Sequence, residues 1–201
     1  MRTNYAVWLG LLIIAVLITL AAKYYAYFPG DVAAARWVQS LVPQDLNWAE
    51  RVSLTGQFPW LLLILAPILA LSWALAGWRA ALLSLLSLAG ILALGNWLGP
   101  AIARPRPTPE MVRVWRPLTG SACPSLFALR FAATFGFLAI LAAVKGRGRP
   151  WGALLLGCGA VLIFGGVARI ALGAHWPSDV IISYYWGLLW AAILIRFALL
   201  G

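Results

Sequence analysis

The chain has little of the chemistry on which many enzymes depend. Among its 201 residues are one histidine, two cysteines and five acidic residues. Two cysteines and one histidine are too few ligands for a zinc cluster, and a disulfide framework needs more cysteines than this. We therefore expect no bound metal and no cofactor. Charged residues make up only 10% of the chain and hydrophobic residues 64%, so the lipid bilayer must be its solvent.

Long apolar runs dominate the sequence. Runs of about 20 mostly apolar residues recur, which is the length that crosses the hydrocarbon core as a helix. Six such runs indicate an all-α fold, a six-transmembrane-helix bundle that forms a single membrane domain over residues 1–201. They extend over about Tyr5 to Ala22, Phe58 to Ala76, Ala80 to Leu98, Pro124 to Val144, Trp151 to Ile170 and Val180 to Leu199.

The net charge of +10 is spread over short loops rather than gathered in one domain, so we expect no nucleic-acid partner. The basic connector from Lys145 to Pro150 is typical of a cytoplasmic turn, which would put both termini in the cytoplasm. The third connecting loop, residues 99–122, would then lie outside although it carries Arg104, Arg106, Arg113 and Arg116. We interpret these four arginines as held there for function.

One polar insertion interrupts the apolar pattern, at residues 31–52. Asp31 can cap a helix, and several apolar residues fall partly on one side of that helix. We expect a helix that lies on the outer membrane surface.

The single histidine, His175, has the most informative surroundings in the chain. Arg169 stands six residues before it and Asp179 four residues after it. If the segment straddles a helix start, it supplies an anion clamp, a nucleophile and a carboxylate that could orient the imidazole, which suits phosphate chemistry. The alternative is a lone histidine at the membrane interface with unrelated charges nearby.

Three segments occur in order, each at the outer end of an expected span: Ala103 to Pro107, Cys123 to Arg130, and Arg169 to Asp179. Together they resemble the motifs of the type 2 phosphatidic acid phosphatase superfamily, which are Lys-x6-Arg-Pro, Pro-Ser-Gly-His and Ser-Arg-x5-His-x3-Asp. The resemblance covers roughly Gly99 to Gly187 and the six-span layout. It implies the helical fold shared by these phosphatases and the haloperoxidases.

The resemblance also implies roles for particular residues. The third motif matches at Arg169, His175 and Asp179, with Ala168 in place of its serine. By this likeness His175 is the nucleophile that attacks phosphorus and Asp179 holds the imidazole. Arg106, from the first motif, and Arg169 clamp the phosphoryl oxygens. Stabilising the charge spread over those oxygens is most of the catalytic task in phosphoryl transfer.

Two motif positions depart from the family pattern. Gly99 stands where the first motif has lysine, and Leu126 and Phe127 stand where the second has Gly-His. The missing histidine would protonate the departing alkoxide, and the loss of a general acid costs about 10²- to 10⁴-fold in rate. The missing lysine removes one positive charge from a site that must hold a phosphate dianion.

Other residues could compensate in part. Arg130 stands one helical turn after the lost histidine, and an arginine in an apolar span is costly enough to indicate a function. The alternative is that Arg130 snorkels or pairs locally. Ser125 and Ser121 could donate hydrogen bonds to phosphate, although Ser125 could instead cap a helix. Glu110 is a candidate acid, or a solvated loop carboxylate.

Two classes of function follow. In the first, the protein is a phosphatase-like membrane protein that binds a lipid phosphate or diphosphate headgroup at the outer interface, with impaired or diphosphate-restricted activity. A polyprenyl diphosphate fits best, because its leaving group needs little protonation. In the second, the chain is an inactive homologue that serves as an accessory subunit of a membrane-protein complex. A transporter is less favoured, because no intramembrane acidic pair is evident. We expect the protein to lie in a bacterial inner membrane.

Overall fold

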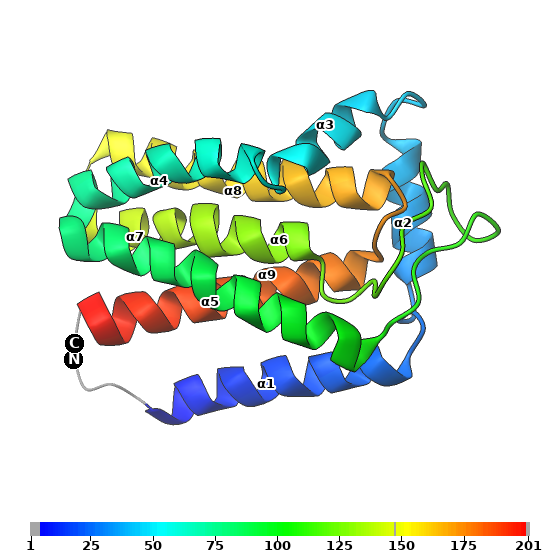
Figure 1. Ribbon diagram of the computed structural model, residues 1–201, viewed down its shortest axis with the longest axis horizontal. Coiled ribbons are helices and arrows are strands. Elements are labelled where there is room, and N and C mark those ends of the chain that lie inside the picture. Colours follow the sequence, from blue (N-terminus) through cyan, green and yellow to red (C-terminus); the bar gives the residue numbers. More distant parts are fainter. Residues whose placement is uncertain (1–4, 147, 200–201) are drawn as a thin grey trace.

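The computed structural model describes residues 5–146 and 148–199 of the chain, which fold into a bundle of helices that run side by side (Figure 1). The elements are α1 (Tyr5–Tyr24), α2 (Asp31–Ser40), α3 (Asn47–Thr55), α4 (Trp60–Ala76), α5 (Trp78–Ile102), α6 (Leu126–Phe131), the π-helical η1 (Ala132–Gly136), α7 (Phe137–Lys145), α8 (Arg149–Ala171), α9 (Pro177–Leu194) and the π-helical η2 (Ile195–Leu199). The expected all-α fold is confirmed.

Five helices are long and apolar enough to cross a bilayer, and six if α3 and α4 form one bent span. α4 has only 17 residues, and it meets α3 at an angle of 60° across a short break. The continuous segment from α6 through η1 to α7 is the centre of the bundle, since 72% of its membrane window is buried. α1 is the most peripheral span, with 17% buried. The cavity described below lies at one end of this central segment.

The expected surface helix over residues 31–52 is wrong as a single element. The chain breaks between α2 and α3, at residues 41–46, where Pro43 lacks the backbone N–H that a continuous helix needs. α2 lies across the end of the bundle (Figure 1), and Gln39 ties it there by donating hydrogen bonds to the carbonyl oxygens of Ile170 and Ala171 at 3.3 and 3.2 Å. Both carbonyls lie in the last turn of α8, and that of Ile170 also accepts from the N–H of Gly173 at 2.9 Å. α2 is therefore part of the protein's folded cap.

The two ends of the bundle differ in character. α2, α3 and the long loop that follows α5 gather at one end (Figure 1). The α4–α5 and α7–α8 connections and the start of α1 lie at the other end. Lys145 and Arg149, from the basic connector, belong to this second end, whereas Arg147 of the same connector lies outside the described residues, as do residues 1–4 and 200–201.

Candidate anion-binding site

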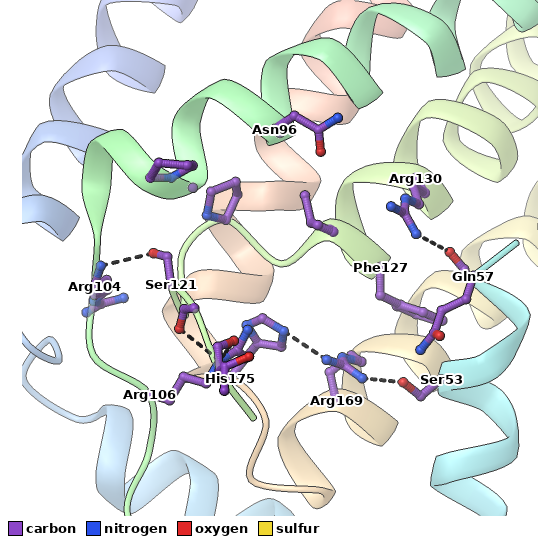
Figure 2. Close-up of a pocket in the computed structure, with 18 of the residues that line it drawn as sticks. Ser53, Gln57, Asn96, Arg104, Arg106, Ser121, Phe127, Arg130, Arg169 and His175 are labelled. Atoms are coloured by element: carbon purple, nitrogen blue, oxygen red, sulfur yellow. Dashed lines mark hydrogen bonds between the residues drawn. The ribbon is translucent and has the colours of Figure 1, made fainter. Parts of the chain in front are cut away.

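A cavity of about 1040 Å³ opens at the capped end of the bundle (Figure 2). Its walls come from the α3–α4 junction, the last turns of α5, the loop after α5, α6, α8 and the loop before α9. Four arginines and the only histidine line it, and none of the lining residues is acidic. The charged and polar lining residues are Ser53, Gln57, Asn96, Arg104, Arg106, Thr119, Ser121, Arg130, Arg169 and His175. Such a set attracts an anion.

His175 presents a neutral imidazole to this cavity. The side chain is 3% exposed, with Nδ1 2.6 Å from the carbonyl oxygen of Ala122 and Nε2 2.9 Å from Nη2 of Arg169. A carbonyl can only accept a hydrogen bond, so Nδ1 carries the proton and Nε2 accepts from the guanidinium. Burial lowers the pKa of His175, and the positive charges of Arg169 and Arg106 lower it further. This tautomer keeps the lone pair on Nε2, where it accepts the hydrogen bond from Arg169.

The expected hydrogen bond between Asp179 and His175 is replaced by other contacts. The carboxylate of Asp179 accepts from the backbone N–H of Trp176 at 2.8 Å, which caps the start of α9, and it forms an ion pair with Arg104. Both ring nitrogens of His175 are already engaged with Ala122 and Arg169. The physical reason is that the buried Arg104 needs a counter-ion, and Asp179 supplies it.

Arg104 is the residue to which the sequence analysis assigned no specific role. Its side chain is fully buried between Asp179 and Asp31, whose carboxylate lies 3.4 Å from Nη2. Nη1 also donates to Ser178 Oγ at 2.9 Å, and Ser178 in turn donates to Asp31. This buried ion network joins the starts of α2 and α9 to the loop after α5. The network explains how a loop arginine, Arg104, can be fully buried.

The network also reaches His175 through the main chain. The carbonyl oxygen of Arg104 accepts a hydrogen bond from the N–H of Ala122 at 2.8 Å, and the carbonyl of Ala122 then accepts from His175. Asp179 is therefore connected to the imidazole only indirectly, through Arg104 and Ala122. The signal available in the sequence was the pair of arginines in Arg104-Pro105-Arg106-Pro107, of which only the second was assigned a role.

Arg106 and Arg169 lie with His175 in the same cavity. Arg169 donates to His175 and, through Nη1, to Ser53 on α3. Arg106 donates to the carbonyl oxygen of Ala174 at 2.6 Å and to two carbonyl oxygens of the loop after α5. Burial lowers the pKa of Arg106. Protein carbonyls thus hold the Arg106 guanidinium at the mouth of the cavity, next to the histidine (Figure 2).

Arg130 supplies a further guanidinium, from α6. Its Nη1 donates to the carbonyl oxygen of Gly56 at 2.6 Å, while its buried Nε has no hydrogen-bond partner in the described structure. Figure 2 shows Phe127 between Arg130 and Arg169 along one wall of the cavity. Arg130 thus belongs to the cavity, as well as pairing locally with the end of α3.

Ser125 and Glu110 follow the structural alternatives that the sequence left open, whereas Ser121 lines the cavity. Ser125 is fully buried, caps α6 by accepting from the N–H of Ala128 at 3.4 Å, and is not among the lining residues. Ser121 lines the cavity, but its hydroxyl donates to the carbonyl oxygen of Cys123 at 2.6 Å. Glu110 is exposed in the loop after α5, where a hydrogen bond from Thr108 lowers its pKa. Ser125 therefore caps a helix and does not face the cavity.

Phe127, at the position of the missing histidine, is closely packed. Its ring stacks on Phe131 with centroids 4.0 Å apart, and the guanidinium of Arg169 lies 5.8 Å from its centroid. Gly56 and Gly165 flank the ring, and a Cβ at either position would overlap it. Glycines on α8 and at the end of α3 thus make the space that the larger aromatic side chain fills.

The two motif departures differ in this respect. Leu126 also packs against a glycine, Gly95 on α5, where a Cβ would overlap its side chain. At Gly99, which lines the cavity, an added Cβ would meet no atom within 4 Å. Leu126 and Phe127 are thus closely packed, whereas the cavity wall at Gly99 has open space.

Comparisons with known proteins agree with this architecture. The family model described as the PAP2 superfamily matches residues 80–199, more than half of the chain. A solved structure of a transmembrane PAP2 type phosphatidylglycerolphosphate phosphatase from Bacillus subtilis is similar to this fold, with a TM-score of 0.72 and 19% sequence identity over 95% of each chain. A comparison with curated proteins found no significant match.

Proposed function

Because the chain belongs to the PAP2 superfamily, we propose that its cavity binds the phosphate group of a membrane lipid and removes a phosphate from diphosphate lipids in preference to monophosphates. One observation carries this proposal. Arg106, Arg130 and Arg169 line one cavity with His175, and no lining residue is acidic. Guanidinium groups form charge-assisted, often bidentate hydrogen bonds with phosphate, which favours a dianionic or trianionic headgroup.

The preference for diphosphates follows from what the cavity lacks. Attack by Nε2 of His175 needs a leaving group that departs without a proton, because Phe127 cannot donate one. A lipid monophosphate expels a basic alkoxide, whereas a lipid diphosphate expels a phosphate monoester that is stable as an anion. General acid catalysis is worth about 10²- to 10⁴-fold, so the two lipid classes should differ by a factor of that order.

We also propose that the cavity end faces outward from a bacterial inner membrane, with both termini cytoplasmic. Lys145 and Arg149 at the opposite end are typical of a cytoplasmic turn. The basic residues at the cavity end are held by protein partners: Arg104 in its ion network, and Arg116 on Glu50 at 2.8 Å. These contacts account for two of the arginines at the cavity end, so their presence there does not require that end to be cytoplasmic.

The test is a first-turnover assay with purified protein in excess over lipid, in nanodiscs. We expect polyprenyl diphosphate to lose a phosphate at least about 10² times faster than phosphatidic acid. His175→Ala should abolish this conversion, and Arg169→Ala should weaken lipid binding. Arg116→Ala, which removes an exposed arginine at the same end, is the matched control and should change neither. Equal rates on both lipids, or conversion that survives His175→Ala, would contradict the proposal.

The second candidate is an inactive homologue that serves as an accessory subunit. The close packing of Phe127 between Gly56 and Gly165 favours this candidate. A protein that no longer needs a general acid can fill that position with an apolar side chain. This candidate predicts no conversion of either lipid and constitutive co-purification with a larger membrane complex. Purification in mild detergent followed by native mass measurement distinguishes the two.

A further inference from the structure

The chain contains five carboxylates, and none of them lines the cavity. Asp31 and Asp179 pair with Arg104, and Glu50 accepts from Arg116 and, at 3.2 Å, from Trp115 Nε1. The other two are in loops and do not line the cavity: Asp45, which accepts from the N–H of Asn47 at 3.0 Å, and the exposed Glu110. Every carboxylate is thus either bonded elsewhere or outside the cavity lining.

The remaining proton-transfer groups are absent from the cavity as well. No cysteine, lysine or tyrosine is among the lining residues, and the neutral ones are serine, threonine, amide or apolar side chains. Cys123, behind the wall, is buried, and its thiol pKa is raised by that burial. Of the lining residues, only His175 can exchange a proton near neutral pH. It has to serve as the nucleophile.

We propose that the protein forms a phosphoryl-His175 that persists, so that its first half-reaction outruns its second. The inference rests on the proposed function, because it requires His175 to attack a lipid diphosphate. It goes beyond that function by stating which step limits turnover and which covalent state of the protein accumulates.

The first half-reaction balances without an acid. The hydrogen bond from Arg169 to Nε2 opens, and the freed Nε2 lone pair of His175 forms the N–P bond to the terminal phosphorus. The bond from phosphorus to the bridging oxygen breaks, and its electron pair leaves with the lipid phosphate monoester. The Nδ1 proton remains on the hydrogen bond to Ala122. The guanidiniums of Arg106 and Arg169 can follow the phosphoryl oxygens throughout, because they carry permanent charge.

The second half-reaction lacks a general base. Water must form a bond to phosphorus while the P–N bond breaks and its electron pair returns to Nε2, and the attacking water must give up a proton. The family's second histidine stands where this chain has Phe127, and no other lining residue can take that proton. The absence of general base catalysis slows such a step by about 10²- to 10⁴-fold. The phosphoryl group therefore stays on His175 for longer than it takes to form.

Rapid-quench measurement tests this, using polyprenyl diphosphate labelled at its terminal phosphate. We expect a burst of about one lipid monophosphate per chain, followed by turnover about 10²–10⁴ times slower than the burst. The label should remain on the protein after alkaline quenching and be lost in acid, as a phosphorus–nitrogen bond requires. His175→Ala should show neither burst nor label.

Phe127→His tests the cause. It restores an imidazole in the space between Gly56 and Gly165, so steady turnover should rise about 10²-fold and the burst should disappear. Arg116→His is the matched control, because it adds an imidazole at an exposed position of the same end that does not line the cavity, and it should leave the burst intact. If Phe127→His does not fold, Phe127→Ala with imidazole in the buffer makes the same comparison.

The possible failures are distinct. Linear conversion of the diphosphate with no burst and no labelled protein overturns the persistent intermediate while the proposed function stands. No conversion at all overturns both. A burst that remains in Phe127→His, or in Phe127→Ala with imidazole, shows that the missing base does not limit turnover and overturns the inference.

Discussion

The buried ion network offers the sharpest prediction for stability. Arg104→Met keeps most of the side-chain volume but leaves Asp31 and Asp179 without their cation. Their side chains are 4% and 0% exposed, and Arg104 itself is 0% exposed. Removing one partner of a buried ion pair costs about 3–5 kcal/mol, since the remaining charge stays desolvated. We therefore expect Arg104→Met to lower the free energy of unfolding by about that amount.

A surface ion pair at the same end of the protein provides the internal control. Arg116 and Glu50 lie 2.8 Å apart, with side chains 68% and 28% exposed. Exposed pairs contribute about 0–1 kcal/mol, so Arg116→Ala should change the free energy of unfolding by no more than that. The short distance of this surface pair is no guide to its contribution, because water screens it.

Unfolding of the protein in mixed micelles by increasing sodium dodecyl sulfate, followed by tryptophan fluorescence, measures both variants. Neutralising the stranded carboxylates in the combined variant Arg104→Met, Asp31→Asn and Asp179→Asn should recover part of the loss, because no unpaired charge remains buried. Equal losses for Arg104→Met and Arg116→Ala would refute this reasoning.

Further predictions concern packing, binding and pH. Gly165→Ala should lower the free energy of unfolding by about 1–3 kcal/mol through overlap with Phe127. In a protein that already carries Phe127→Ala, the same Gly165→Ala change should cost less in the same micelle assay. Equilibrium binding of a lipid diphosphate should weaken in Arg169→Ala, persist in His175→Ala and strengthen in Gly99→Lys, whose side chain has open space. Because the folded pKa of His175 is lowered below 6.5, the unfolded chain binds more protons below that pH. The free energy of unfolding should therefore fall as pH drops from about 6.5 towards the lowered folded pKa, and His175→Gln should flatten this slope.

Some features of the site follow from local sequence, and these were predicted. The spacing of Arg169 and His175 across the end of α8 brings both side chains into one cavity, because the short loop after the helix folds back within a few residues. Arg106 reaches that cavity as its motif implies. The roles of these residues in binding and catalysis remain predictions that the experiments above test.

Other features depend on which distant segments meet. The sequence offers Asp179 two partners, His175 four residues away and Arg104 in another loop, and only packing shows that it pairs with Arg104. From the sequence, Phe127 likewise indicated only that the histidine of the second motif is missing. Gly56 and Gly165, far from it in the chain, turn that position into a fitted aromatic contact. No local pattern carries this information.

The sequence by itself determined that the chain is a helical membrane protein and that Arg106, Arg169 and His175 lie at the same end of it. Long apolar runs have few alternatives in a bilayer, where every backbone polar group must be satisfied within its own helix. Only the tertiary structure decided that residues 31–52 form two helices, that Ser125 caps α6, and that Arg104 holds the carbonyl facing His175. These outcomes depend on competition among several possible partners for each buried polar group, and that competition is decided by which helix ends converge.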